Sequence, residues 1–267
     1  MDIDVNGAAV FAHTGGKPFD PAQPVLMLIH GAGTDHTFWG LQTRYFAHHG
    51  YSILAVDLPG HGRSDGPPLD SIDALGEWVW QMLDAVGVET AALAGHSMGS
   101  LIALAAGAQQ PDKTDALILV GTADRVAVHE DLLSAGDNQD PRAFEMITDW
   151  GFGKPAHLGG HQAPGLWMQG SARALLRAGT PGVLGADLAA CNAYDGAVAA
   201  AQQITCPVLL LLGAGDRMTP PRMTKALVDV LAQVETEILP GTGHMIMVER
   251  PNETIDAIDG FLQRVAA

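Results

Sequence analysis

Short apolar runs alternate with longer segments whose apolar positions recur every three or four residues. The runs are too continuous for strands with one solvent-facing side, so we expect strands buried on both faces. They cover residues 25–29, 51–56, 90–94 and 116–120. Helical spacing follows at 38–48, 71–86 and 101–109. This alternation predicts a mostly parallel central sheet covered by helices on both faces, preceded by an edge hairpin in residues 3–12.

The alternation stops near residue 122 and returns near residue 204. Between them the pattern is helical, broken by Gly and Pro, with no run typical of a buried strand. The returning elements are a strand at 207–212, a helix at 221–231, a strand at 235–239 and a helix at 251–265. Because the chain returns to complete the same sheet, we expect residues 1–121 and 204–267 to form one core domain. Residues 122–203 are expected to form a helical cap inserted in it.

Ser97 lies in the motif Gly-His-Ser-Met-Gly, between the predicted strand 90–94 and the predicted helix 101–109. In this context Gly-x-Ser-x-Gly is typical of a nucleophile elbow, a tight turn that strains the serine backbone and exposes its hydroxyl. Gly95 and Gly99 stand where a side chain would collide with the crossing backbone. We therefore expect Ser97 to be a nucleophile.

A serine nucleophile needs a base to take its proton and a third group to orient that base. Asp216 follows the predicted strand 207–212, and His244 follows the predicted strand 235–239. Sites in parallel sheets lie at the carboxyl ends of the strands. The sequence therefore predicts that Ser97, Asp216 and His244 meet at one edge of the sheet.

Five motifs in order extend this pattern over nearly the whole chain, which resembles α/β-hydrolase-fold enzymes of the large esterase-like branch with a helical cap. They are His30-Gly31, Asp57-x-Pro-Gly-x-Gly-x-Ser64, Gly95-His-Ser97-Met-Gly99, Gly213-x-x-Asp216-x-x-x-Pro220 and Gly243-His244. The resemblance implies that Ser97 is the catalytic nucleophile, His244 the general base and then acid, and Asp216 its orienting partner. It also implies an oxyanion hole made by the backbone N–H groups of Ala32 and Met98.

The resemblance leaves one alternative position for the catalytic acid and argues against two classes of enzyme. Some relatives keep the catalytic acid at the position of Asp124, but Asp216 sits in the fuller motif. A serine at position 97, in place of an aspartate, argues against haloalkane dehalogenase and epoxide hydrolase activity. His96 is expected to be structural, and His30, His61, Asp57, Arg63 and Ser64 are expected to form a network that braces the oxyanion-hole loops. His157 and His161 have no Cys or carboxylate at ligand spacing, so no metal is expected.

We expect a cofactor-independent serine hydrolase that cleaves small to medium carboxylic esters through an acyl-enzyme. Trp150, Phe152, Trp167 and Met168, in the predicted cap, are candidates for lining an apolar substrate pocket. The same triad would also suit a lactonase, a thioesterase, a C–C bond hydrolase or a perhydrolase. A non-catalytic small-ligand receptor is the alternative from another class.

Composition narrows the possible partners and the location. The 267 residues carry a formal net charge of −16, which argues against nucleic acid or an anionic membrane as a partner. The first residues lack the pattern of a signal peptide, and no apolar run is long enough to span a bilayer, so a cytoplasmic location is expected. The two cysteines, Cys191 and Cys206, are expected to be buried free thiols. The acyl specificity and the oligomeric state are not indicated.

Overall fold

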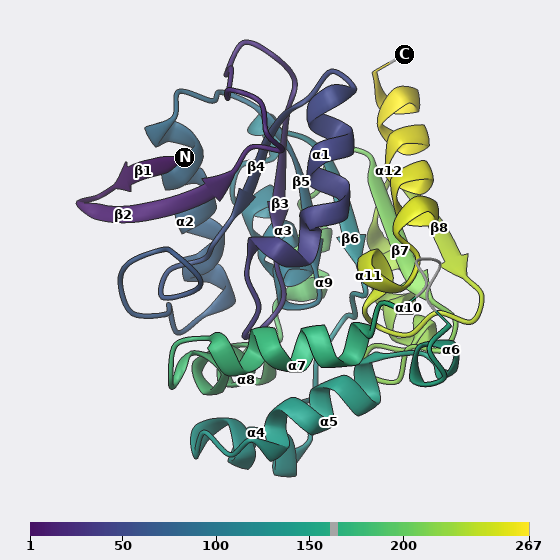
Figure 1. Ribbon diagram of the computed structural model, residues 1–267. Helices are drawn as coiled ribbons and strands as arrows, with labels where there is room; N and C mark the ends of the chain where they lie inside the picture. Colours follow the sequence, from purple (N-terminus) through teal and green to yellow (C-terminus); the bar gives the residue numbers. More distant parts are fainter. Residues whose placement is uncertain (161–164, 267) are drawn as a thin grey trace.

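The computed structural model describes residues 1–160 and 165–266. It confirms the predicted sheet, in which the strand order is β1-β2-β4-β3-β5-β6-β7-β8 (Figure 1). The edge pairs β1·β2 and β2·β4 are antiparallel, and the remaining neighbours are parallel. The strands are β1 (Asp2–Val5), β2 (Ala8–His13), β3 (Val25–Ile29), β4 (Ser52–Val56), β5 (Ala91–His96), β6 (Thr114–Val120), β7 (Val208–Gly213) and β8 (Val234–Leu239).

Helices cover both faces of the sheet, which explains why β3, β4, β5 and β7 are buried along their whole length. Helices α1, α11 and α12 pack on one face, and α2, α3 and α10 on the other (Figure 1). These helices and the 3₁₀ turns near them are η1 (His36–Trp39), α1 (Gly40–His48), α2 (Ile72–Ala85), α3 (Met98–Gln109), η2 (Pro111–Lys113), η3 (Pro221–Thr224), α10 (Lys225–Val230), α11 (Ile246–Glu249) and α12 (Pro251–Val265). The helix predicted at 221–231 therefore begins as a 3₁₀ turn at its proline pair.

In the described part of the chain, six helices lie between β6 and β7 in the sequence. They are α4 (Glu130–Asp137), α5 (Arg142–Gly151), α6 (Lys154–His157), α7 (Met168–Ala178), α8 (Val183–Ala193) and α9 (Ala197–Ala201). Helices α4, α5, α7 and α8 gather at one end of the sheet (Figure 1), and we call α4–α8 the inserted helices. The short α6 and α9 escaped prediction because four or five residues show no period, and α9 packs against α3. The predicted domain boundaries at 122 and 203 stay a prediction.

Two further observations concern the cysteines and the apolar character of the helices. Cys191 and Cys206 are buried and unpaired, as predicted. Burial raises the pKa of the Cys206 thiol to about 11 and raises that of Cys191 further, so neither thiol is a ready nucleophile. Among the described helices, none combines the length and the apolar character that crossing a membrane requires.

Candidate active site

Ser97 occupies a strained turn between β5 and α3. Its φ of 53° and ψ of −118° are rare for a residue with a side chain, and its N–H donates a hydrogen bond to Val120 O at 2.9 Å. A Cβ on Gly95 would collide with the carbonyl of Gly99, and a Cβ on Gly99 would collide with the carbonyl of Ile29. The elbow predicted from the motif is therefore present, and only glycine fits on both sides of the serine.

His244 and Asp216 form a buried hydrogen-bonded pair. The Nδ1–H of His244 donates to Asp216 Oδ2 at 2.7 Å, while Asp216 Oδ1 accepts from the N–H groups of Met218 and Thr219 at 2.8 and 2.9 Å. Burial would raise the pKa of Asp216, but the electrostatic interaction and hydrogen bond with His244 and the hydrogen bonds from Thr219 hold it well below its usual range. Asp216 is therefore a carboxylate that fixes the tautomer of His244.

Thr219 strengthens this pair and was missed from the sequence. Its hydroxyl lies 2.8 Å from Asp216 Oδ2, 3.1 Å from His244 Nδ1 and 3.0 Å from Gly121 O. It follows Asp216 by three residues, so an Asx-type turn after the acid was the available signal. The predicted alternative acid, Asp124, makes no hydrogen bond with His244 in the described structure.

His244 lines a cavity of about 430 Å³ that Ser97 also lines, and its other imidazole nitrogen is Nε2. This Nε2 atom is buried and has no hydrogen-bond partner among the described residues. Since Nδ1 carries the proton toward Asp216, Nε2 holds a free lone pair. Ser97 and His244 thus line one cavity, and Asp216 is hydrogen-bonded to His244, while the catalytic roles of the three stay a prediction.

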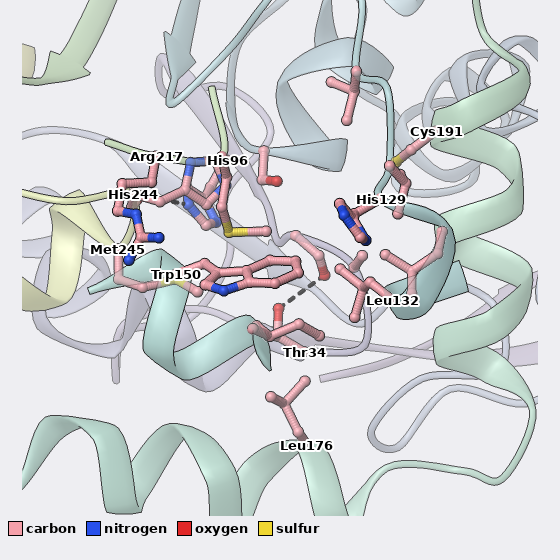
Figure 2. A pocket seen from close by; sticks show the side chains of 18 of the residues that line it. Thr34, His96, His129, Leu132, Trp150, Leu176, Cys191, Arg217, His244 and Met245 are labelled. Atoms are coloured by element: carbon pink, nitrogen blue, oxygen red, sulfur yellow. Dashed lines mark hydrogen bonds between the residues drawn. The ribbon is translucent and has the colours of Figure 1, made fainter. Parts of the chain in front are cut away.

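The cavity is mostly apolar, and its walls come from the sheet edge and from the inserted helices. Figure 2 shows His244, Arg217 and Met245 on one side and His129, Leu132 and Cys191 on the other, with Trp150 between them. Ile147, Leu176 and Leu188 complete an apolar wall contributed by three of the inserted helices. The helical spacing of apolar residues in the sequence did not show which of these side chains face the cavity.

Of the four predicted pocket residues, only Trp150 lines this cavity. Phe152 and Met168 are 2% and 3% exposed because both pack into the hydrophobic core. Trp167, which precedes α7, is 63% exposed to solvent. The structure does not place Phe152, Met168 or Trp167 at this cavity, although Phe152 lines a neighbouring cavity of about 480 Å³, because hydrophobicity alone does not distinguish a core position from a pocket wall.

The loop after β3 lies directly beside Ser97. A Cβ on Gly31 would be 3.3 Å from Ser97 Cβ, and the following residue, Ala32, lines the cavity. On the other side, Met98 is the first residue of α3, where backbone N–H groups have no partner within the helix. The two N–H groups predicted as an oxyanion hole thus belong to segments that flank Ser97.

Asp187, on α8, ties that loop to the inserted helices. Its Oδ2 accepts hydrogen bonds from Gly33 N at 2.7 Å and from His61 Nε2 at 2.8 Å. His61 Nδ1 lies 3.0 Å from Pro59 O, so both ring nitrogens face acceptors and the ring is an imidazolium. Burial would lower the pKa of His61, but the hydrogen bond and charge of Asp187 raise it.

His30 and His96 are buried and neutral. His96 Nε2–H donates to His244 O at 2.9 Å, and its Nδ1 has no partner among the described residues. His30 Nδ1–H donates to Gly31 O, and its Nε2 accepts from Leu58 N. Burial lowers the pKa of each to about 3, and electrostatic interaction with a neighbouring ring, His244 for His96 and His61 for His30, adds to this effect. Both histidines brace the site, which matches the structural role expected from the sequence.

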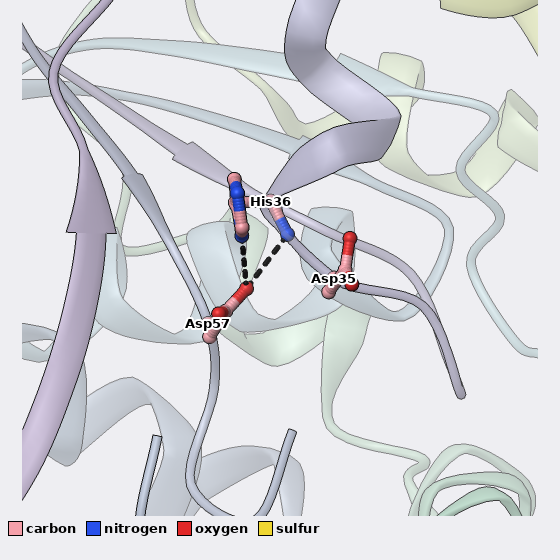
Figure 3. Close-up of side chains that lie close together, drawn as sticks. All are labelled: Asp35, His36 and Asp57. Carbon is pink, nitrogen blue, oxygen red and sulfur yellow. Dashed lines mark hydrogen bonds and ion pairs between the residues drawn. The ribbon is translucent and has the colours of Figure 1, made fainter. Parts of the chain in front are cut away.

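Asp57 lies with Asp35 and His36 in a group close enough to hold a metal ion (Figure 3). Its oxygens are already occupied, because Oδ1 accepts from His36 N and Nδ1 and Oδ2 accepts from Arg63 N. Asp35 accepts from Thr37 N at the start of η1. The cluster therefore braces two loops, although the predicted network differs in that His61 pairs with Asp187 instead.

Glu249 joins the loop of His244 to the inserted helices. Its carboxylate accepts from Gly243 N at 3.0 Å and from Gly153 N at 2.9 Å, and His244 N–H donates to Gly151 O at 2.6 Å. Burial raises the pKa of Glu249, although these hydrogen bonds lower it in part. His157 Nδ1 accepts a hydrogen bond from Gln169 Nε2 at 3.0 Å, and His161 lies outside the described residues.

Comparison with known proteins identifies the family. The family model for the alpha/beta hydrolase fold matches residues 24–251. The chain belongs to this family. Among solved structures, an enol-lactonase from Burkholderia xenovorans superimposes with a TM-score of 0.85 at 21% identity, covering 98% of this chain and all of that one.

Two other relatives carry names of hydrolases. A pimeloyl-[acyl-carrier protein] methyl ester esterase from Neisseria meningitidis is 32% identical over 226 residues, which is 79% of this chain and 68% of the relative. An (E)-2-((N-methylformamido)methylene)succinate hydrolase from Acinetobacter baylyi is 23% identical over 244 residues, 89% of this chain and 90% of the relative. The chain is thus similar to hydrolases of different substrates.

Proposed function

We propose that this alpha/beta hydrolase cleaves small to medium carboxylic esters through an acyl-enzyme, with Ser97, His244 and Asp216 as its catalytic triad. The observation that carries the proposal is that His244, oriented by Asp216 and with no hydrogen-bond partner on Nε2 among the described residues, lines the same cavity as Ser97. A base with this geometry at a strained serine is what acyl transfer requires. The ester hydrolase among the relatives is consistent with it.

In the proposed reaction, Ser97 Oγ attacks the ester carbonyl carbon and its proton passes to His244 Nε2. The negative charge on the carbonyl oxygen is stabilised by the N–H groups of Ala32 and Met98. The C–O bond to the alcohol breaks as His244 returns the proton to the leaving oxygen. Water, deprotonated by the same nitrogen, then releases the acid and restores Ser97.

The size and lining of the cavity support a small or medium substrate. About 430 Å³ lies at the lower end of the range for small-molecule sites. Its apolar walls suit an aliphatic acyl or alcohol group. The partner we propose is therefore a small ester, with neither nucleic acid nor a membrane involved.

The experiment is hydrolysis of p-nitrophenyl acetate and butyrate by the wild type and by Ser97→Ala. We expect turnover by the wild type and a loss of about 10³-fold or more in the variant. Ser171→Ala, at an exposed serine of α7 outside both cavities, is the matched control and should keep activity. Persistent turnover by a pure Ser97→Ala protein would refute the triad, and a parallel panel of lactones and thioesters tests the alternative substrates.

Covalent labelling separates an enzyme from a receptor on the same fold. A fluorophosphonate reacts with an activated serine, so we expect stoichiometric labelling of Ser97 in the wild type. Failure to label, together with no turnover of any ester, would favour the receptor.

A further inference from the structure

The described lining of the cavity beside Ser97 carries a positive charge and no acidic side chain. Among the described residues that line it is Arg217, and none of them is Asp or Glu. The chain as a whole has 30 acidic residues against 14 Lys and Arg. Asp216 precedes Arg217, but its carboxylate is buried and both of its oxygens accept hydrogen bonds. Because the protein is acidic overall, a pocket lined by a cation and by no carboxylate indicates an anionic ligand.

Arg217 forms no polar interaction that would stabilise the described part of the fold. Its guanidinium makes no ion pair or hydrogen bond with another described residue, and its side chain is exposed. Arg142, Arg173 and Arg264, by contrast, each approach a carboxylate within 2.8 Å. The planar guanidinium of an arginine matches a carboxylate through two parallel hydrogen bonds. Arg217 is thus a permanent cation that has its hydrogen-bond donors available to a ligand.

The position of Arg217 is close to the reacting groups. Figure 2 shows it beside His244 and Met245, on the side of the pocket away from His129. It also lines a second cavity of about 480 Å³, to which Lys154 and His157 contribute and whose described lining again contains no acid. Arg217 therefore belongs to both cavities, and the positive charge continues beyond it.

We propose that Arg217 binds the free carboxylate of a half-ester of a dicarboxylic acid while the ester group reacts at Ser97. The methylene chain between the two groups lies against the apolar walls of the first cavity. This inference rests on the proposed function and names the substrate class of the same site. Arg217 is here a specificity-determining residue, and it takes no part in proton transfer.

The test compares esters that differ only at the far end of the acyl chain. Monomethyl succinate, glutarate and adipate are matched with methyl butanoate, pentanoate and hexanoate, and acid release is followed by pH-stat titration. The variants are Arg217→Gln, Arg217→Lys and the control Arg222→Gln, which removes the same charge from an exposed residue outside both cavities. The readout is the ratio of kcat/KM for each half-ester to that for its neutral partner.

We expect this ratio to fall about tenfold in Arg217→Gln, through KM, and to recover in part in Arg217→Lys. Arg222→Gln should keep the wild-type ratio. A ratio unchanged by Arg217→Gln, or lowered equally by both glutamine variants, overturns the carboxylate site. No hydrolysis of either series by the wild type would instead overturn the proposed esterase function, so the two failures are distinguishable.

Discussion

The carboxylate of Asp187 accepts a hydrogen bond from the backbone N–H of Gly33, at a distance of 2.7 Å. Asp187 lies on α8 and Gly33 follows Ala32, so a residue of the inserted helices holds the loop that we propose as half of the oxyanion hole. The same oxygen binds the buried imidazolium of His61. Two segments separated by 154 residues thus meet at one atom beside the site.

Replacing Asp187 with Asn should lower kcat about tenfold with little change in KM, because the loop loses a charged acceptor and its N–H groups shift against the transition state. Ester kinetics measure this. The control is Asp195→Asn, an exposed acid just beyond α8, which should behave as the wild type. A wild-type kcat in Asp187→Asn would show that the loop holds its position without this contact.

Replacing Glu249 with Gln should destabilise the protein by about 1–3 kcal/mol. A glutamine has one oxygen, so either Gly153 N or Gly243 N would face an amide group that cannot accept a hydrogen bond. Urea unfolding of the variant, beside Glu89→Gln on the surface as control, measures the loss. Equal stability of both variants would mean that the glutamate is dispensable.

The neutral His96 should make the fold sensitive to acid. Its pKa of about 3 lies below the ordinary value of 6.5, so between these values the unfolded chain binds a proton that the folded chain does not. Stability is therefore present above about pH 6.5 and falls with decreasing pH, by about 1 kcal/mol per unit for this group.

Urea unfolding at pH 7 and pH 5.5 tests this sign. His96→Asn, which can keep a donor to His244 O, should lose less stability on acidification than the wild type, by about 1–2 kcal/mol. His49→Asn, at an exposed histidine, should retain the wild-type dependence. An identical loss in His96→Asn and in the wild type contradicts the assignment of a neutral buried ring.

We expect that the turn at Ser97 has no room for a side chain at Gly95. Gly95→Ala puts a methyl group into the carbonyl of Gly99, and we expect a loss of about 3 kcal/mol or more together with loss of activity. Gly40→Ala is the control, since Gly40 has a helical φ of −56° and open space around it, and it should be neutral or slightly stabilising. Thermal unfolding compares the two, and equal melting temperatures would contradict the crowding.

The amino-acid sequence was enough to predict the sheet, the elbow and the positions of Ser97, Asp216 and His244 at strand ends. These depend on local rules: apolar runs for buried strands, glycines where backbones cross, and strand ends that share one edge of a parallel sheet. The folded structure was needed to show which residues of the inserted helices line the cavity. It was also needed to show that Asp187 and Glu249 join those helices to the site and that Arg217 lines the pocket. Such contacts depend on how the helices pack against the sheet. Hydrophobic periodicity predicts which face of a helix is buried, but it does not predict what that face packs against.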